Sequence, residues 1–187
     1  MRKIKTIFDR NWENNRKVNS KVVVDFDFEN AIATEKLDGM NIRLTIRNHT
    51  VVRVEKRRNP NKVQKQQGIS EPWYVDADEF GTADKWIFDA VRHTDFTTVP
   101  DGEWSAEALG KNIQGNPLNL NNHQVFIFSL PEWRKKITLK NVPTTYEELK
   151  AWLPQQKSKL GNNTGIEGIV WHHPNGEMVK IKVKDFD

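Results

Sequence analysis

The sequence lacks cysteine entirely among its 187 residues. This absence excludes disulfide bonds, and it excludes the thiolate metal sites on which zinc fingers depend. It also fits a reducing compartment such as the cytoplasm. Any nucleophilic or metal chemistry must therefore use other side chains.

Long apolar runs are missing too. The N-terminal stretch MRKIKTIFDRNWENN is charged and has no apolar segment of the kind found in secretory signals, and no segment approaches the roughly 20 apolar residues of a membrane span. We therefore expect a cytoplasmic protein with no membrane partner.

Repeats, low-complexity tracts and linkers rich in proline, glycine or serine are absent as well. The length allows one sizeable core and is short for two average domains, so we expect a single domain over residues 1–187. The formal net charge of +4 is modestly basic. Such a charge is compatible with an anionic partner and equally with an ordinary solvated surface.

Alternating apolar and polar residues predict antiparallel strands in the first half of the chain. The pattern occurs in KVVVDFDF (21–28), NIRLTIR (41–47) and VVRVEKR (51–57). Asn48-His49, between the last two segments, is typical of a tight turn.

The second half contains a further hairpin pattern. IEGIVWHH (166–173) and EMVKIKV (177–183) flank Pro174-Asn175-Gly176, which is typical of a hairpin turn. His172 and His173 end the first of these segments; they point to opposite faces of a strand, which disfavours a shared metal ion, and we expect them at the surface. VFIFSL (125–130) is a short apolar run that predicts a strand buried on both faces.

Two helices are expected between the strands, near 84–93 and at 145–153. Thr145 and Glu148 have the spacing of a capping box at the start of the second helix. The combination predicts an α+β fold with antiparallel sheets.

Chemistry is suggested first by Lys36 in the motif K-L-D-G, whose glycine lets a ligand approach the backbone closely. Such a short match carries little weight alone. Further motifs follow in a fixed order: D-G-E-W at 101–104, the aromatic run that includes Phe128, E-G-I-V at 167–170 and K-I-K at 180–182.

In this order the motifs resemble those of the covalent nucleotidyltransferase superfamily, which comprises ATP-dependent DNA and RNA ligases and mRNA capping enzymes. The resemblance covers roughly residues 30–187, and EWSAEALGKNIQGNPLNL (103–120) is particularly similar to phage-type RNA ligases. It implies a ligase-type nucleotidyltransferase domain, with two packed antiparallel sheets and flanking helices around a nucleotide cleft. A phage-infected or bacterial cell is then the expected source.

The resemblance implies a reaction through lysyl-AMP. Lys36 would attack the α-phosphate of ATP, and Mg²⁺ or Mn²⁺ would assist. AMP would pass to an RNA 5′-phosphate, which is then sealed to a 3′-hydroxyl, as in RNA repair. The partner would be RNA, and we expect a monomer.

The residue types suit this reaction, because a lysine nucleophile must be deprotonated and nearby cations favour that state. Lys180 and Lys182 occupy alternate positions of one strand and point to the same face, where they could also neutralise the α-phosphate. The alternative is that both are the solvated side of an amphipathic strand.

Two acidic residues are hard oxygen donors suited to Mg²⁺ or to ribose hydroxyls. By resemblance Glu103 would favour the ribose and Glu167 the metal, although the two roles could be exchanged.

Other contacts are implied for the nucleotide. Phe128 would stack on adenine, unless it is a core residue, and Glu35 would approach the adenine edge. Arg58, or alternatively Arg57, would contact ribose or phosphate, and spacing alone leaves this choice open.

The sequence also departs from its relatives. Met40 stands where a small hydroxyl residue is common, and Ser129 where an aspartate is common. The chain ends five residues after K-I-K, without the C-terminal oligonucleotide-binding barrel of DNA ligases and capping enzymes. We therefore favour an RNA ligase or its catalytic domain. The alternatives are a DNA ligase or capping-type domain, or a non-catalytic nucleic-acid-binding module of the same fold.

Overall fold

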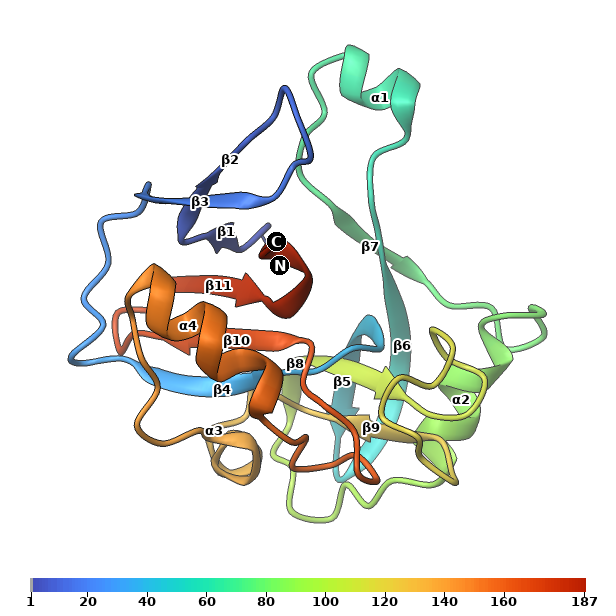
Figure 1. Cartoon of the computed structure of the whole chain (residues 1–187). Helices are drawn as coiled ribbons and strands as arrows, with labels where there is room; N and C mark the ends of the chain where they lie inside the picture. The colour runs from blue at the N-terminus through green and yellow to red at the C-terminus, as the bar shows by residue number, and fades with distance from the viewer. Residues whose placement is uncertain (1) are drawn as a thin grey trace. The chain divides into compact units, whose positions relative to one another are not determined.

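Contacts divide residues 2–187, which the computed structural model describes, into two units. Figure 1 labels the helices and strands along the chain. We call Asp38–Arg134, with residues 2–3, the middle unit, and Ile4–Leu37 with Lys135–Asp187 the terminal unit. Each unit buries its own cluster of apolar side chains.

The middle unit is built on an antiparallel sheet with the strand order β7-β6-β5-β8-β9. Its strands are β5 (Met40–Arg47), β6 (Thr50–Arg58), β7 (Trp73–Asp76), β8 (Gly102–Leu109) and β9 (Gln124–Phe126). β5 and β6 form the predicted hairpin. Asn48 and His49 in its turn have φ angles of 48° and 61°, as the tight turn favoured between twisted strands requires.

Helices of the middle unit are α1 (Lys62–Gln66), α2 (Lys85–Arg92) and α3 (Pro131–Arg134). α2 confirms the helix expected near 84–93. Its buried Ile87 and Ala90 pack in one cluster with Ile42, Leu44 and Ile46 of β5. α2 therefore covers the apolar face of the sheet, and the alternate residues of the strands form a polar face.

The terminal unit contains a sheet with the order β1-β11-β10-β4 and a separate pair, β2-β3. The strands are β1 (Lys5–Thr6), β2 (Phe8–Arg10), β3 (Val18–Val22), β4 (Ile32–Lys36), β10 (Gly168–His172) and β11 (Met178–Lys182). β10 and β11 confirm the predicted hairpin, and Gly176 in its turn has a φ of 93°.

Helical segments of this unit are η1 (Lys135–Ile137), α4 (Tyr146–Trp152), η2 (Leu153–Gln155) and η3 (Val183–Asp185). α4 confirms the expected helix, and Leu149 and Leu153 pack in the same cluster as Ile169 and Ile181. The predicted capping box is wrong, because the Thr145 hydroxyl donates to Glu148 Oε2 at 2.8 Å and caps no backbone amide.

Two strand predictions also need correction. Segment 23–28 lies outside any strand, and β3 ends at Val22. Its alternation instead reflects side-chain packing, since Phe28 contacts Trp171 edge to face at 5.3 Å. The run 125–130 is a strand only as far as Phe126, because the chain then turns into α3.

The fold class is nevertheless the expected one, because the structure is a mixed α+β fold with antiparallel sheets. Among the helices formed by residues 2–187, none is sufficiently long and apolar to cross a membrane.

Candidate functional site

Strand pairing in the terminal unit brings Lys36 and Lys182 to one place. Lys36 ends β4 and Lys182 ends β11, and both pair with Gly168 at the start of β10. Paired residues of antiparallel strands project to the same face, so the two lysines flank Gly168 on one side of the sheet. A Cβ on Gly168 would lie 2.1 Å from the carbonyl oxygen of Ile181, so this close pairing requires glycine.

The carboxylate of Glu167, the residue before Gly168, bridges the two lysines. Lys36 Nζ donates to Oε2 at 2.8 Å, and Lys182 Nζ lies 2.9 Å from Oε1. Burial by itself would raise the pKa of Glu167, but the charges and hydrogen bonds of Lys36 and Lys182 outweigh it, so the pKa lies below its usual value. The cluster is a carboxylate kept ionised between two cations.

Lys180 shares a face with Lys182. Val179 and Ile181, the alternate residues of β11, are buried in the core of the unit. Lys180 and Lys182 thus share one face, as strand alternation predicted, and the strand register places Lys36 on that same side of the sheet.

Glu35 points to the opposite side of β4 and is only 2% exposed. Its carboxylate accepts hydrogen bonds from Ser158 Oγ at 2.5 Å and from the Lys159 backbone nitrogen at 2.8 Å. Burial raises the pKa of Glu35 in spite of these bonds. The carboxylate thereby fastens the turn after η2 to the strand that carries Lys36.

His172 is a correction to the sequence analysis. It is buried, and its Nε2 lies 3.0 Å from Thr34 Oγ1, whereas His173 at the strand end contacts Asp27 at 3.2 Å. His172 alternates with the core residue Trp171 along β10, so its side chain lies on the same face of the sheet as Lys36 and Lys182.

Alternation in β6 separates the two arginines that spacing left open. Lys56 pairs with the core residue Ile42, so Arg57 lies on the polar face and Arg58 on the other. Glu103 pairs with Thr45 and shares the polar face with Arg57. Among residues 2–187, Arg57 Nε is buried and has no hydrogen-bond partner, whereas Arg58 is exposed. Of the two arginines, Arg57 is the one whose donor is available on the face of Glu103.

Phe128 lies just beyond β9 and is half-buried, outside the core cluster that contains Ile127. Its carbonyl oxygen accepts from Arg134 Nε at 3.0 Å, which fixes the backbone there. Next to it, Ser129 Oγ donates to the carbonyl of Ser105 at 2.7 Å.

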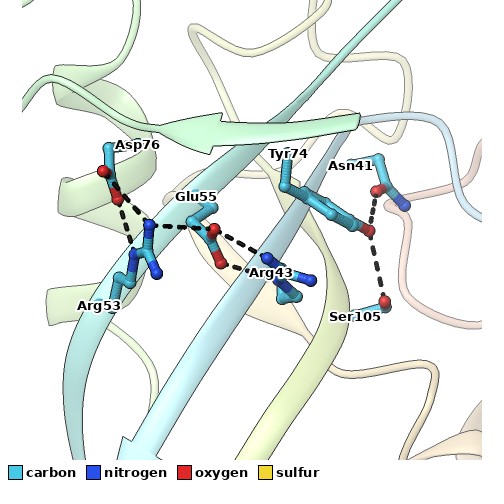
Figure 2. A network of polar contacts seen from close by, with 7 residues as sticks. All are labelled: Asn41, Arg43, Arg53, Glu55, Tyr74, Asp76 and Ser105. Atoms are coloured by element: carbon cyan, nitrogen blue, oxygen red, sulfur yellow. Dashed lines mark hydrogen bonds and ion pairs between the residues drawn. The ribbon is translucent and has the colours of Figure 1, made fainter. Parts of the chain in front are cut away.

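The sequence analysis missed a polar network on the middle unit (Figure 2). Arg43 forms two hydrogen bonds to Glu55, at 2.7 and 2.8 Å, and Arg53 joins Glu55 to Asp76 with contacts of 3.5 and 2.8 Å. Glu55 is 2% exposed, and the hydrogen bonds from Arg43 lower its pKa in spite of burial. The predicted strands place three of these charged residues at non-core positions: Arg43, Arg53 and Glu55. This shared polar face was the feature of the sequence that could have indicated the network.

This network provides a stability prediction. Glu55→Ala should lower the free energy of unfolding by about 3 kcal/mol, because it leaves the partly buried Arg43 guanidinium without its partner. Asp76→Ala is the matched control: its side chain is 68% exposed, so solvent screens its pair with Arg53 and its removal should cost much less stability than Glu55→Ala. Urea denaturation of both variants measures the difference, and equal losses would contradict the role given to Glu55.

Metal-binding capacity is limited to small donor sets. Among residues 2–187, no group of three or more His, Cys, Asp or Glu side chains is placed to hold an ion.

Comparison with known proteins points to RNA ligases. Residues 96–186 match a family model described as RNA ligase 1, which is just under half of the chain. No curated protein matches.

Among solved structures, an alanine variant of Naegleria gruberi RNA ligase with ATP and Mn has a TM-score of 0.51 and 16% identity. The alignment covers 83% of this chain and 51% of that one, so the chain spans about half the length of that ligase. A structure of the Naegleria enzyme with PPi has 18% identity and a TM-score of 0.47, with coverages of 84% and 51%.

The chain is thus similar in fold to the nucleotidyltransferase part of an RNA ligase. The family match and the fold confirm the resemblance that the order of the motifs indicated.

Proposed function

We propose that this chain is the nucleotidyltransferase part of an ATP-dependent RNA ligase and that Lys36 carries AMP covalently. The observation that carries the proposal is the cluster of Lys36, Glu167 and Lys182, with contacts of 2.8 and 2.9 Å between residues far apart in sequence. Motif order assigned the same residues to one reaction. The RNA ligase family match adds support.

In the proposed first step, the Lys36 ammonium releases a proton to solvent, and the neutral amine attacks the α-phosphorus of ATP. An N–P bond forms while the bond to pyrophosphate breaks. Because the amine donates to Glu167 in this structure, that ion pair must open before the attack. An RNA 5′-phosphate then takes AMP from Lys36, and a 3′-hydroxyl attacks that phosphate with release of AMP.

The terminal unit suits a divalent ion held together with substrate. Mg²⁺ commonly uses one or two carboxylates plus substrate phosphates, and Mn²⁺ accepts the same oxygen donors. Glu167 would supply the carboxylate, with Glu103 as the alternative. When bound, the ion would neutralise charge on the phosphates.

The remaining roles are proposals from the motifs. Arg57 and Glu103 would contact ribose or phosphate, Phe128 would stack on adenine, and Lys180 with Lys182 would bind the α-phosphate. Glu35 would approach the adenine edge only after releasing a bond, because its carboxylate already accepts hydrogen bonds from Ser158 and Lys159.

We further propose that both units serve one nucleotidyltransferase domain over residues 1–187, and that the protein acts on RNA ends as a cytoplasmic monomer.

The test is incubation of the chain with ATP radiolabelled on the α-phosphate, with Mg²⁺ or Mn²⁺, followed by denaturing electrophoresis. We expect a labelled protein band that acid removes, as a phosphoramide requires. Absence of label with both ions would contradict the proposed function and favour a non-catalytic nucleic-acid-binding module.

The nucleotide should be ATP in preference to GTP. The prediction rests on Phe128 as a stacking residue and on the lack of an evident guanine-specific acid in the motifs. Parallel labelling with α-labelled ATP and GTP at equal concentration measures the preference. Comparable labelling by GTP would shift the assignment towards a capping-type enzyme.

A further inference from the structure

Tyr74 lies on the edge strand β7, but its hydroxyl reaches two strands on the far side of β6 (Figure 2). The hydroxyl donates to Asn41 Oδ1 of β5 at 2.7 Å, and it lies 3.3 Å from Ser105 Oγ of β8. The ring therefore lies across the polar face of the sheet.

The ring is held in this position from the side as well. The guanidinium carbon of Arg43 lies 4.6 Å from the ring centroid, and Arg43 is itself fixed by two hydrogen bonds to the buried Glu55. Burial raises the pKa of Tyr74, which keeps the hydroxyl protonated as a donor. The network of Figure 2 thus directs one donor at one acceptor, Asn41 Oδ1.

This bond determines how the Asn41 amide is turned. With Oδ1 occupied by Tyr74, the Nδ2 group, which carries two N–H donors, points away from the tyrosine. Arg57, the strand partner of Tyr74, supplies another donor on the same face, the buried Nε without a partner. Amide and guanidinium donors without a protein acceptor suit the anionic oxygens of a phosphate.

We propose that Tyr74 is a positioning residue that turns the Asn41 amide so that its N–H donors, beside Arg57 Nε, bind a phosphate oxygen of the nucleotide. The inference rests on the proposed function. If the network only tied the strands together, loss of the Tyr74 hydroxyl would change stability and leave the rate unchanged.

The experiment is a double-mutant cycle on the rate of lysyl-AMP formation, with Tyr74→Phe, Asn41→Ala and the double variant in the 187-residue chain. Tyr74→Phe keeps the ring over Arg43 and removes one hydrogen bond, so we expect a loss of about fivefold to tenfold. Asn41→Ala removes the donor itself and should cost about 10²-fold. Because Tyr74 acts through Asn41, the double variant should be no slower than Asn41→Ala.

Tyr146→Phe is the matched control, since it removes a hydroxyl that donates to the Val18 carbonyl, at 3.3 Å in the terminal unit. It should react at the parent rate. Thermal unfolding of all variants is measured alongside.

The outcomes separate the two levels of the proposal. A parent rate in Tyr74→Phe would overturn the positioning role, as would a fivefold loss that persists in the Asn41→Ala background. If the parent chain forms no adduct, the proposed function fails, and the positioning role fails with it.

Discussion

Lys36→Ala is expected to abolish the protein–AMP adduct, because no other amine in the proposed mechanism can replace the nucleophile. Lys36→Arg should fail as well, since a guanidinium stays protonated and cannot attack phosphorus. Folding should change little. Glu167 would still pair with Lys182 at 2.9 Å, so we expect a loss of stability of about 1 kcal/mol or less.

Labelling with α-radiolabelled ATP measures the adduct, and urea denaturation measures stability. Lys21→Ala is the control, because Lys21 is an exposed lysine of β3 in the same unit and should label like the parent chain. An adduct in Lys36→Ala near the parent level would refute the assignment of the nucleophile.

Much of the sheet structure could be predicted because side-chain burial has a period of two in a strand. The hairpins at 40–58 and 168–182 combine this alternation with turn residues that tolerate positive φ, such as Asn48 and Gly176. Segment 23–28 has the same alternation but forms no strand. The alternation of apolar and polar residues indicates which side chains are buried, but it does not show whether the backbone is hydrogen-bonded to a neighbouring strand.

The lysine cluster was predictable for a related reason. Alternation placed Lys180 and Lys182 on one face, but pairing of both Lys36 and Lys182 with Gly168 depends on the register of three strands. Register is set by long-range packing. The order of the motifs therefore identified these residues, but it could not predict their ion pairs to Glu167.

Tyr74 could not be recognised in advance. Its short strand carries no clear alternation, and its function depends on reaching Asn41 and Ser105 across a neighbouring strand. Likewise, the choice between Arg57 and Arg58 required knowing which β6 residue faces the core, which follows from the pairing of Lys56 with Ile42.

Lys180→Ala and Lys182→Ala are each expected to slow the sealing of RNA that is supplied already adenylylated at its 5′ end. Both lysines lie on the face of β11 that carries the proposed phosphate site, and phosphate contacts recur in each step. Loss of one preorganised donor typically costs about 10²–10³ in rate, so activity should fall sharply without vanishing. Lys36→Ala should retain sealing on this substrate, because the covalent step is bypassed.

Gel separation of ligated and unligated RNA over time gives these rates. Lys184→Ala is the matched control, because Lys184 follows β11 with an exposed side chain and should seal at the parent rate. Lys182→Ala also removes one partner of Glu167, whereas Lys180→Ala leaves both ion pairs of Glu167 in place. A defect confined to Lys182→Ala would therefore locate the effect in Glu167 rather than in phosphate binding. If both variants sealed the adenylylated RNA at the parent rate, the two lysines would act in the first step alone or be solvated strand residues, and their placement in a shared phosphate site would be wrong.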